Sequence, residues 1–199
     1  MSKGDWVDQV VPPALPRTHG ALARWLGRTV LALGGWKVTG RFADIDKAIL
    51  IVAPHSSWWD GIWGMAAKLA MGLRVEIMAK HELFNPLLAP LLRALGAVPI
   101  DRGNAHGVVP AMAARFRNAE QLWLVIAPEG TRRRVEHWKS GFWHIARAAE
   151  VPVVCVYFHY PERLIGIGPA LTMTGDLAGD MARVREFYRP WRGKTRSTL

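Results

Sequence analysis

Residues 48–60 read AILIVAPHSSWWD, and this stretch decides the fold. Its first part, Ala48–Ala53, is apolar and rich in β-branched residues and is followed by Pro54, a pattern that predicts a buried strand. Ser57 then fits the N-cap of a helix, and Asp60 falls at the third helical position as its capping-box partner. A strand that leads into a helix N-terminus predicts an α/β domain with a site at the strand end.

The first candidate for catalysis is the pair formed by His55 and Asp60. The imidazole of His55 is expected to project from the turn, and the carboxylate of Asp60 from the first helical turn, so that the two side chains meet. A histidine held by a carboxylate is a general base with a fixed tautomer. The plainer interpretation is a solvated histidine next to an aspartate that only caps the helix.

A second polar loop follows the apolar run Leu122–Ala127 and reads PEGTRRR over residues 128–134. Gly130 lets the backbone approach a ligand closely. Thr131 offers a hydroxyl group, and Arg132 offers a bidentate fork for phosphate or carboxylate. Taken alone, the loop also fits a solvated basic turn.

A third strand and loop, GAVPIDRG, covers residues 96–103 and includes Arg102. Three elements of this kind are expected to converge at one edge of a sheet, which brings a His–Asp pair next to two arginines. The chemistry indicated is deprotonation of a hydroxyl group on a molecule that also carries phosphate.

The combination resembles the glycerolipid (lysophospholipid) acyltransferases of the 1-acylglycerol-3-phosphate acyltransferase type. The resemblance spans roughly residues 48–160 and rests on three features in the family's order and a weaker fourth: His55 with Asp60, residues 96–102, residues 129–132, and residues 151–156. It implies that His55 is the general base and that Asp60 orients it. It also implies that the phosphorylated acceptor is bound by Arg102, Glu129, Gly130, Thr131 and Arg132.

The implied activity is that of an O-acyltransferase. The fatty acyl group comes from a thioester of coenzyme A or acyl carrier protein and moves to the hydroxyl of a lysophospholipid-type acceptor, with no metal and no other cofactor. The chain departs from the family pattern next to the acceptor loops, at Pro99, Ala127 and Arg133. Three alternatives therefore stay open: a non-phosphate alcohol or amine as acceptor, hydrolysis of the thioester, and a catalytically silent membrane-binding protein.

Composition indicates an anionic partner. The 199 residues carry a net charge of +10 and include ten tryptophans, which suits an anionic membrane surface better than a nucleic acid, for which no motif is present. No apolar run reaches ~18 residues, and no signal peptide is visible. We therefore expect a cytoplasmic, monotopic protein peripherally associated with the inner face of the cell membrane.

Residues 21–33 predict a basic amphipathic helix. Five apolar side chains fall on one face, while Arg24 and Arg28 lie elsewhere; the five are Leu22, Trp25, Leu26, Val30 and Leu33. This face either lies in a membrane interface or covers the core of the domain. The flanking segments, residues 1–20 and the basic tail 190–199, are expected to be flexible.

The whole chain of 199 residues is predicted to form a single acyltransferase domain with a motif-bearing core over residues 48–160. Its fold class is α/β, with a mixed, mostly parallel sheet flanked by helices and an N-terminal amphipathic helix. Strands are predicted near residues 36–42, 48–53, 74–79, 97–101, 122–127, 152–159 and 164–173. Helices are predicted near residues 20–33, 58–72, 86–95, 107–119, 138–150 and 178–189.

Overall fold

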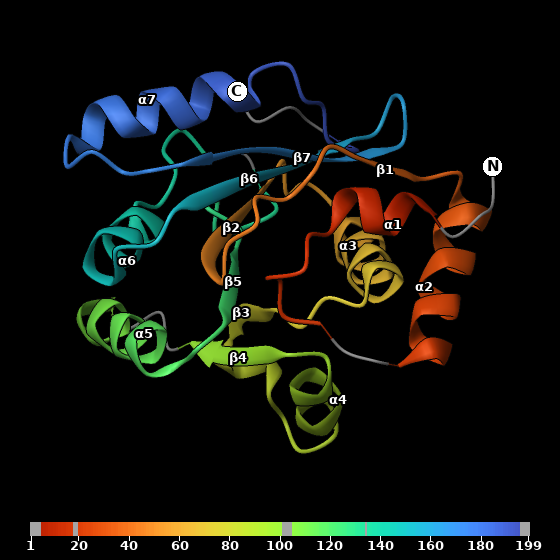
Figure 1. The fold of residues 1–199 in the computed structure, drawn as a ribbon. Helices are drawn as coiled ribbons and strands as arrows, with labels where there is room; N and C mark the ends of the chain where they lie inside the picture. The colour runs from red at the N-terminus through yellow and green to blue at the C-terminus, as the bar shows by residue number, and fades with distance from the viewer. Residues whose placement is uncertain (1–4, 18–19, 101–104, 134, 196–199) are drawn as a thin grey trace.

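The structure is a computed structural model that describes residues 5–17, 20–100, 105–133 and 135–195 (Figure 1). Its strands are β1 (Lys37–Thr39), β2 (Lys47–Ala53), β3 (Glu76–Lys80), β4 (Ala97–Ile100), β5 (Leu122–Ile126), β6 (Val153–His159) and β7 (Leu164–Leu171). Its helices are α1 (Asp5–Val10), α2 (Ala21–Gly34), α3 (Trp58–Met71), the short 3-10 helix η1 (His81–Leu83), α4 (Ala89–Ala94), α5 (Ala105–Asn118), α6 (Gly141–Ala149) and α7 (Leu177–Tyr188). Each predicted strand and helix is present, with ends that differ by a few residues.

The strands form one sheet in the order β1-β7-β6-β2-β5-β3-β4. Strands β6 and β7 pair antiparallel, and the other neighbours pair parallel. This confirms the prediction of a mixed, mostly parallel sheet. Strand β2 lies between β5 and β6, so the strand that carries the His55 motif is central and buried on both faces, as its apolar sequence indicates.

The core lies on both faces of the sheet, because successive side chains of a strand point to opposite sides. Along β2, Ala48 and Leu50 belong to the cluster that contains residues of α1, α2 and α3. Ile49 and Ile51 belong to the cluster that contains residues of α5, α6 and α7. Figure 1 shows α3 and α5 on opposite sides of the strands.

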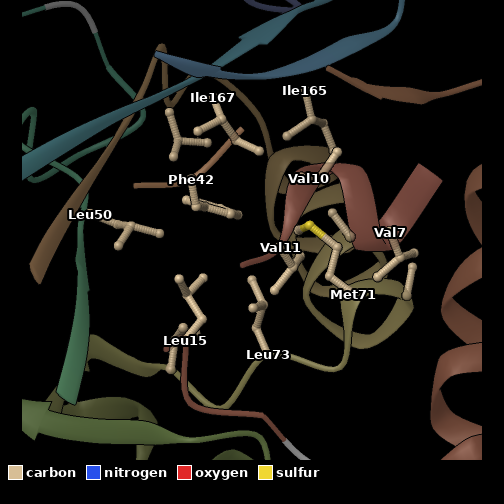
Figure 2. Packing of buried hydrophobic residues seen from close by; sticks show 14 of the residues in the cluster. Val7, Val10, Val11, Leu15, Phe42, Leu50, Met71, Leu73, Ile165 and Ile167 are labelled. Atoms are coloured by element: carbon tan, nitrogen blue, oxygen red, sulfur yellow. The ribbon is translucent and has the colours of Figure 1, made fainter. Parts of the chain in front are cut away.

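The N-terminal segment is packed, which corrects the expectation that residues 1–20 are flexible. Within the described part of that segment, Val7, Val10 and Val11 of α1 and the next turn are buried in the core. Figure 2 shows them close to Met71 and Leu73. Helix α1 is only six residues long, too short for a helical period to be visible in the sequence, and its stability comes from this burial.

The tail also departs from the expectation of a flexible 190–199, as far as its described residues 190–195 show. The Trp191 ring stacks on Tyr157 with ring centroids 3.6 Å apart. The backbone N–H of Tyr160 donates to the carbonyl oxygen of Arg192 at 2.9 Å. Aromatic stacking and these backbone contacts fix a segment whose charge and composition alone suggest mobility.

Helix α2 matches the predicted amphipathic helix and packs on α3. The two backbones come close at Gly27, where an added Cβ would lie 2.5 Å from the carbonyl oxygen of Ala66, so only glycine fits. The predicted apolar face points outward instead of covering the core: Leu22 is 76% exposed, and Leu33 is 84% exposed. Among the described helices, none is long and apolar enough to cross a membrane.

Candidate active site

The candidate site lies where three neighbouring parallel strands end. Strand β2 pairs with β5 on one side and with β6 on the other, and both pairings are parallel. Their carboxyl ends therefore meet at one edge of the sheet, the usual position of a site in an α/β fold. His55 follows β2, the 127–132 loop follows β5, and Tyr160 follows β6.

The turn from β2 into α3 holds Asp60 in a network of hydrogen bonds. Ser57 is the N-cap of α3, and it forms the predicted capping box with Asp60. The carboxylate oxygen Oδ2 of Asp60 accepts the backbone N–H groups of Ser56 at 2.6 Å and of Ser57 at 2.7 Å. The capping interpretation of Asp60 is therefore confirmed, and it coexists with a second contact of the same carboxylate.

That second contact is with the imidazole of His55, as the sequence predicts. Nδ1 of His55 lies 3.4 Å from Oδ2 of Asp60, while the Tyr160 hydroxyl donates to Oδ1 at 2.5 Å. Asp60 is 2% exposed. Burial alone would raise the pKa of this carboxyl, but the hydrogen bonds from His55, Tyr160 and the two backbone N–H groups outweigh it, so the pKa is lowered. Asp60 is thus an anion held against the imidazole.

Glu129 lies behind His55 and not at the surface. Its side chain is 1% exposed, and Oε1 accepts the backbone N–H of His55 at 2.9 Å. Gly130 follows in the left-handed conformation, with φ of 67°, and its N–H donates to the carbonyl oxygen of Ala127 at 3.0 Å. This tight turn, which favours glycine, directs Glu129 inward beneath the histidine.

The rest of the loop approaches the start of α3. The guanidinium carbon of Arg132 stands 3.5 Å from the ring centroid of Trp58, a cation–π contact. The hydroxyl of Thr131 accepts the backbone N–H of Arg133 at 3.3 Å. The fourth predicted element differs in position: Arg102 lies outside the described residues, and β4, which precedes it, is an edge strand separated from β2 by β3 and β5.

An apolar cavity of about 290 Å³ opens beside the His55–Asp60 pair. Its lining includes Gly61 and Gly64 from the first turns of α3 and extends to Leu73 and Val75 beyond the end of this helix. The space therefore runs along α3, between the helix and the sheet. Most of the lining is aliphatic or aromatic, which suits a hydrocarbon chain.

Sequence reasoning missed the contacts that hold the histidine turn from a distance. The Oγ of Ser56 accepts the backbone N–H of Lys194 at 2.9 Å, and its carbonyl oxygen accepts the Thr195 hydroxyl at 3.0 Å. Tyr160 was missed too, although a signal was present: it is a polar residue directly after a predicted strand, as His55 is. The contacts of the tail have no comparable signal in the sequence.

The fold and the site together define the class of protein: an α/β domain with a His–Asp pair at the ends of parallel strands, backed by an apolar cavity. The chain belongs to the Acyltransferase family, whose model matches residues 36–159. The family resemblance noted in the sequence is therefore confirmed.

Two relatives illustrate the match. A 1-acyl-sn-glycerol-3-phosphate acyltransferase of Streptococcus pneumoniae is 30% identical over 130 residues, which cover 65% of this chain and 48% of the relative. Lysophosphatidylcholine acyltransferase 2 of Rattus norvegicus is 31% identical over 172 residues, which cover 80% of this chain and 28% of the relative. The chain thus spans about half of the first relative and less than a third of the second.

A solved structure supports the fold. The crystal structure of the 1-acyl-sn-glycerophosphate (LPA) acyltransferase PlsC from Thermotoga maritima superposes with a TM-score of 0.58 and covers 86% of this chain and 80% of that one. The sequence identity is 18%, so this likeness concerns the fold alone.

Proposed function

We propose that the chain is an O-acyltransferase that moves a fatty acyl group from an acyl thioester to the hydroxyl of a lysophospholipid-type acceptor. The observation that carries the proposal is the position of the His55–Asp60 pair at one end of the apolar cavity. A general base and a hydrocarbon-binding space meet there, and acyl transfer from a thioester requires both.

In the proposed mechanism, His55 takes the proton of the acceptor hydroxyl through Nε2, because Nδ1 faces Asp60. The hydroxyl oxygen attacks the thioester carbonyl and forms a tetrahedral intermediate. The intermediate then collapses, the carbon–sulfur bond breaks, and the imidazolium returns the proton to the leaving thiolate. Asp60 stabilises the imidazolium in between, and no serine nucleophile takes part.

The two substrates are assigned to different parts of the site. The acyl chain of the donor, coenzyme A or acyl carrier protein thioester, occupies the apolar cavity. Arg132 binds the phosphate of the acceptor, with Gly130 and Thr131 shaping the loop around it, and Arg102 adds a second positive charge. Glu129 serves this site by holding His55, because a buried carboxylate facing the turn is poorly suited to contact a phosphate.

We further propose that the protein lies peripherally on the inner face of the cell membrane. Large apolar side chains are exposed on α2 and on the first turns of α3, including Trp25, Trp58 and Ile62. Tryptophan side chains favour the membrane interface, and the net charge of +10 favours anionic lipids. A water-insoluble acceptor can reach the His55 site from such a surface.

The test is release of free thiol from long-chain acyl-coenzyme A, with and without lysophosphatidic acid, by the wild type and by His55→Ala. We expect acceptor-dependent release that His55→Ala abolishes without unfolding. His144→Ala, at an exposed histidine on α6, is the matched control and should keep wild-type turnover. Release that needs no acceptor would instead establish a thioester hydrolase. Vesicle binding without turnover, with coenzyme A and carrier protein donors alike, would establish a silent membrane-binding protein.

A further inference from the structure

We propose that Tyr160 is a positioning residue of the site: its hydroxyl holds one carboxylate oxygen of Asp60 so that the other oxygen stays on His55. The proposal rests on the acyl transfer proposed above. Tyr160 lies one residue beyond the segment that matches the family model, and it comes from β6, the strand next to β2.

The two oxygens of Asp60 have different partners. Oδ2 accepts the two backbone N–H groups of the turn and faces Nδ1 of His55. Oδ1 accepts the hydroxyl of Tyr160. Three donors from two strand ends therefore fix the plane of the carboxylate. Without the tyrosine hydroxyl, a buried oxygen would lose a strong donor, and the carboxylate could rotate away from the imidazole.

Tyr160 is itself held on more than one side, so its hydroxyl is a fixed donor. Its ring meets Trp36 edge to face with centroids 4.9 Å apart, and its backbone N–H donates to the carbonyl oxygen of Arg192. Burial, followed by the hydrogen bond to Asp60, raises the pKa of the Tyr160 hydroxyl far above its ordinary value. The hydroxyl therefore stays protonated, and remains a donor, over the whole working range of pH.

The first experiment compares Tyr160→Phe with the wild type in steady-state acyl transfer. Losing one hydrogen bond to a charged group is expected to lower kcat about 10- to 100-fold. The KM values for donor and acceptor are expected to stay near wild type, because the hydroxyl is assigned to Asp60 and not to a substrate. A loss confined to KM would overturn the proposal.

The pH profile gives a readout that general loss of structure would not. The hydrogen bond from Tyr160 is among those that lower the pKa of Asp60, so its removal raises that pKa. As pH falls, the variant loses the ionised carboxylate sooner than the wild type. The acid limb of kcat/KM therefore moves to higher pH in Tyr160→Phe. An unmoved limb together with unchanged kcat would overturn the proposal.

Two further variants separate this role from a structural one. Tyr157→Phe removes a hydroxyl from the same strand, on the opposite face of the sheet, and is expected to behave as wild type. In an Asp60→Asn background, Tyr160→Phe is expected to cause little further loss of kcat, because the two residues act as one unit. An undiminished further loss would mean that Tyr160 acts independently of Asp60, against the proposal.

An activity-free measurement keeps this inference separate from the proposed function. The ring resonances of His55, assigned by comparison with His55→Ala, are expected to shift in Tyr160→Phe and to stay unchanged in Tyr157→Phe. If the wild type transfers no acyl group, the proposed function fails, while this comparison still decides whether Tyr160 positions the dyad. Unchanged His55 resonances in Tyr160→Phe would overturn the positioning role by itself.

Discussion

Replacing Ala67 with leucine is expected to shorten the acyl chain that the protein transfers. Ala67 is a buried residue of α3 and lines the apolar cavity next to the His55–Asp60 pair. The larger side chain adds about three methylene-sized groups, and each methylene of a long acyl chain that no longer fits loses ~0.8 kcal/mol of burial. The total, about 2.4 kcal/mol, corresponds to a loss of about 60-fold in kcat/KM for the longest accepted chain.

The assay is thiol release from a series of saturated acyl-coenzyme A donors of increasing chain length. Donors shorter than the wild-type optimum by about three carbons should keep wild-type kcat/KM, because the displaced methylenes are the ones they lack. The profile of chain lengths is therefore expected to shift as a whole. A profile that stays the same in a stably folded variant would refute the assignment of the cavity to the acyl chain.

Overpacking is the competing outcome, and Ala66 provides its control. A larger side chain forced into a filled core costs ~1–3 kcal/mol of stability and would affect every donor alike. Ala66 is the preceding residue of α3 and lies where Gly27 of α2 crosses this helix. Ala66→Leu is expected to lower the melting temperature without changing chain preference, the opposite of Ala67→Leu.

Three other predictions concern the acceptor, the histidine turn and the membrane. Arg132→Ala is expected to raise the apparent acceptor KM by about 10- to 100-fold, the loss of a charge-assisted contact, with donor KM unchanged. Glu129→Gln keeps an acceptor for the His55 N–H and should leave unfolding in urea near wild type, whereas Glu129→Ala is expected to lose ~1–3 kcal/mol. The double variant Leu22→Glu and Trp25→Glu is expected to lose most of its co-sedimentation with anionic vesicles, since each buried side chain contributes ~1.5–3 kcal/mol.

Each of these predictions has a control or an outcome that contradicts it. Arg133→Ala, at the exposed neighbour of Arg132, should leave acceptor KM unchanged; a change in donor KM alone would remove the phosphate from Arg132. Equal stability of the two Glu129 variants would mean that the contact with His55 contributes little. Leu87→Glu changes another exposed leucine, far along the chain from α2, and vesicle binding that falls equally in this variant would contradict insertion of α2.

The sequence predicts the sheet well because its central strands are buried on both faces. Such strands appear as short apolar runs such as Ala48–Ala53 and Leu122–Ile126, bounded by polar turns. The start of α3 is equally predictable, because a capping box is a local pattern whose two partners lie three positions apart. Helix α1 lacks such a signal, since its valines gain their order from Met71 and Leu73, which follow much later in the chain.

The amphipathic helix shows what a local pattern leaves undecided. Its apolar face is evident in the sequence, but the direction of this face depends on how α2 meets α3. Close packing at Gly27 and burial of Leu31 direct another part of the helix inward. Leu22 and Trp25 are left outside, so hydrophobic periodicity identifies the helix, while the interhelix contact decides which surface remains available to a lipid.

The candidate site combines local and long-range contacts in the same way. His55 and Asp60 lie in one turn, and their meeting follows from local geometry. The groups that hold the turn are distant in sequence: Glu129 is 74 positions from His55, and Tyr160 is 100 positions from Asp60. They arrive there because β2 lies between β5 and β6, whose carboxyl ends deliver the two side chains to opposite sides of the turn. A histidine and an aspartate at this spacing are therefore not enough for an oriented base; the order of the strands supplies the rest.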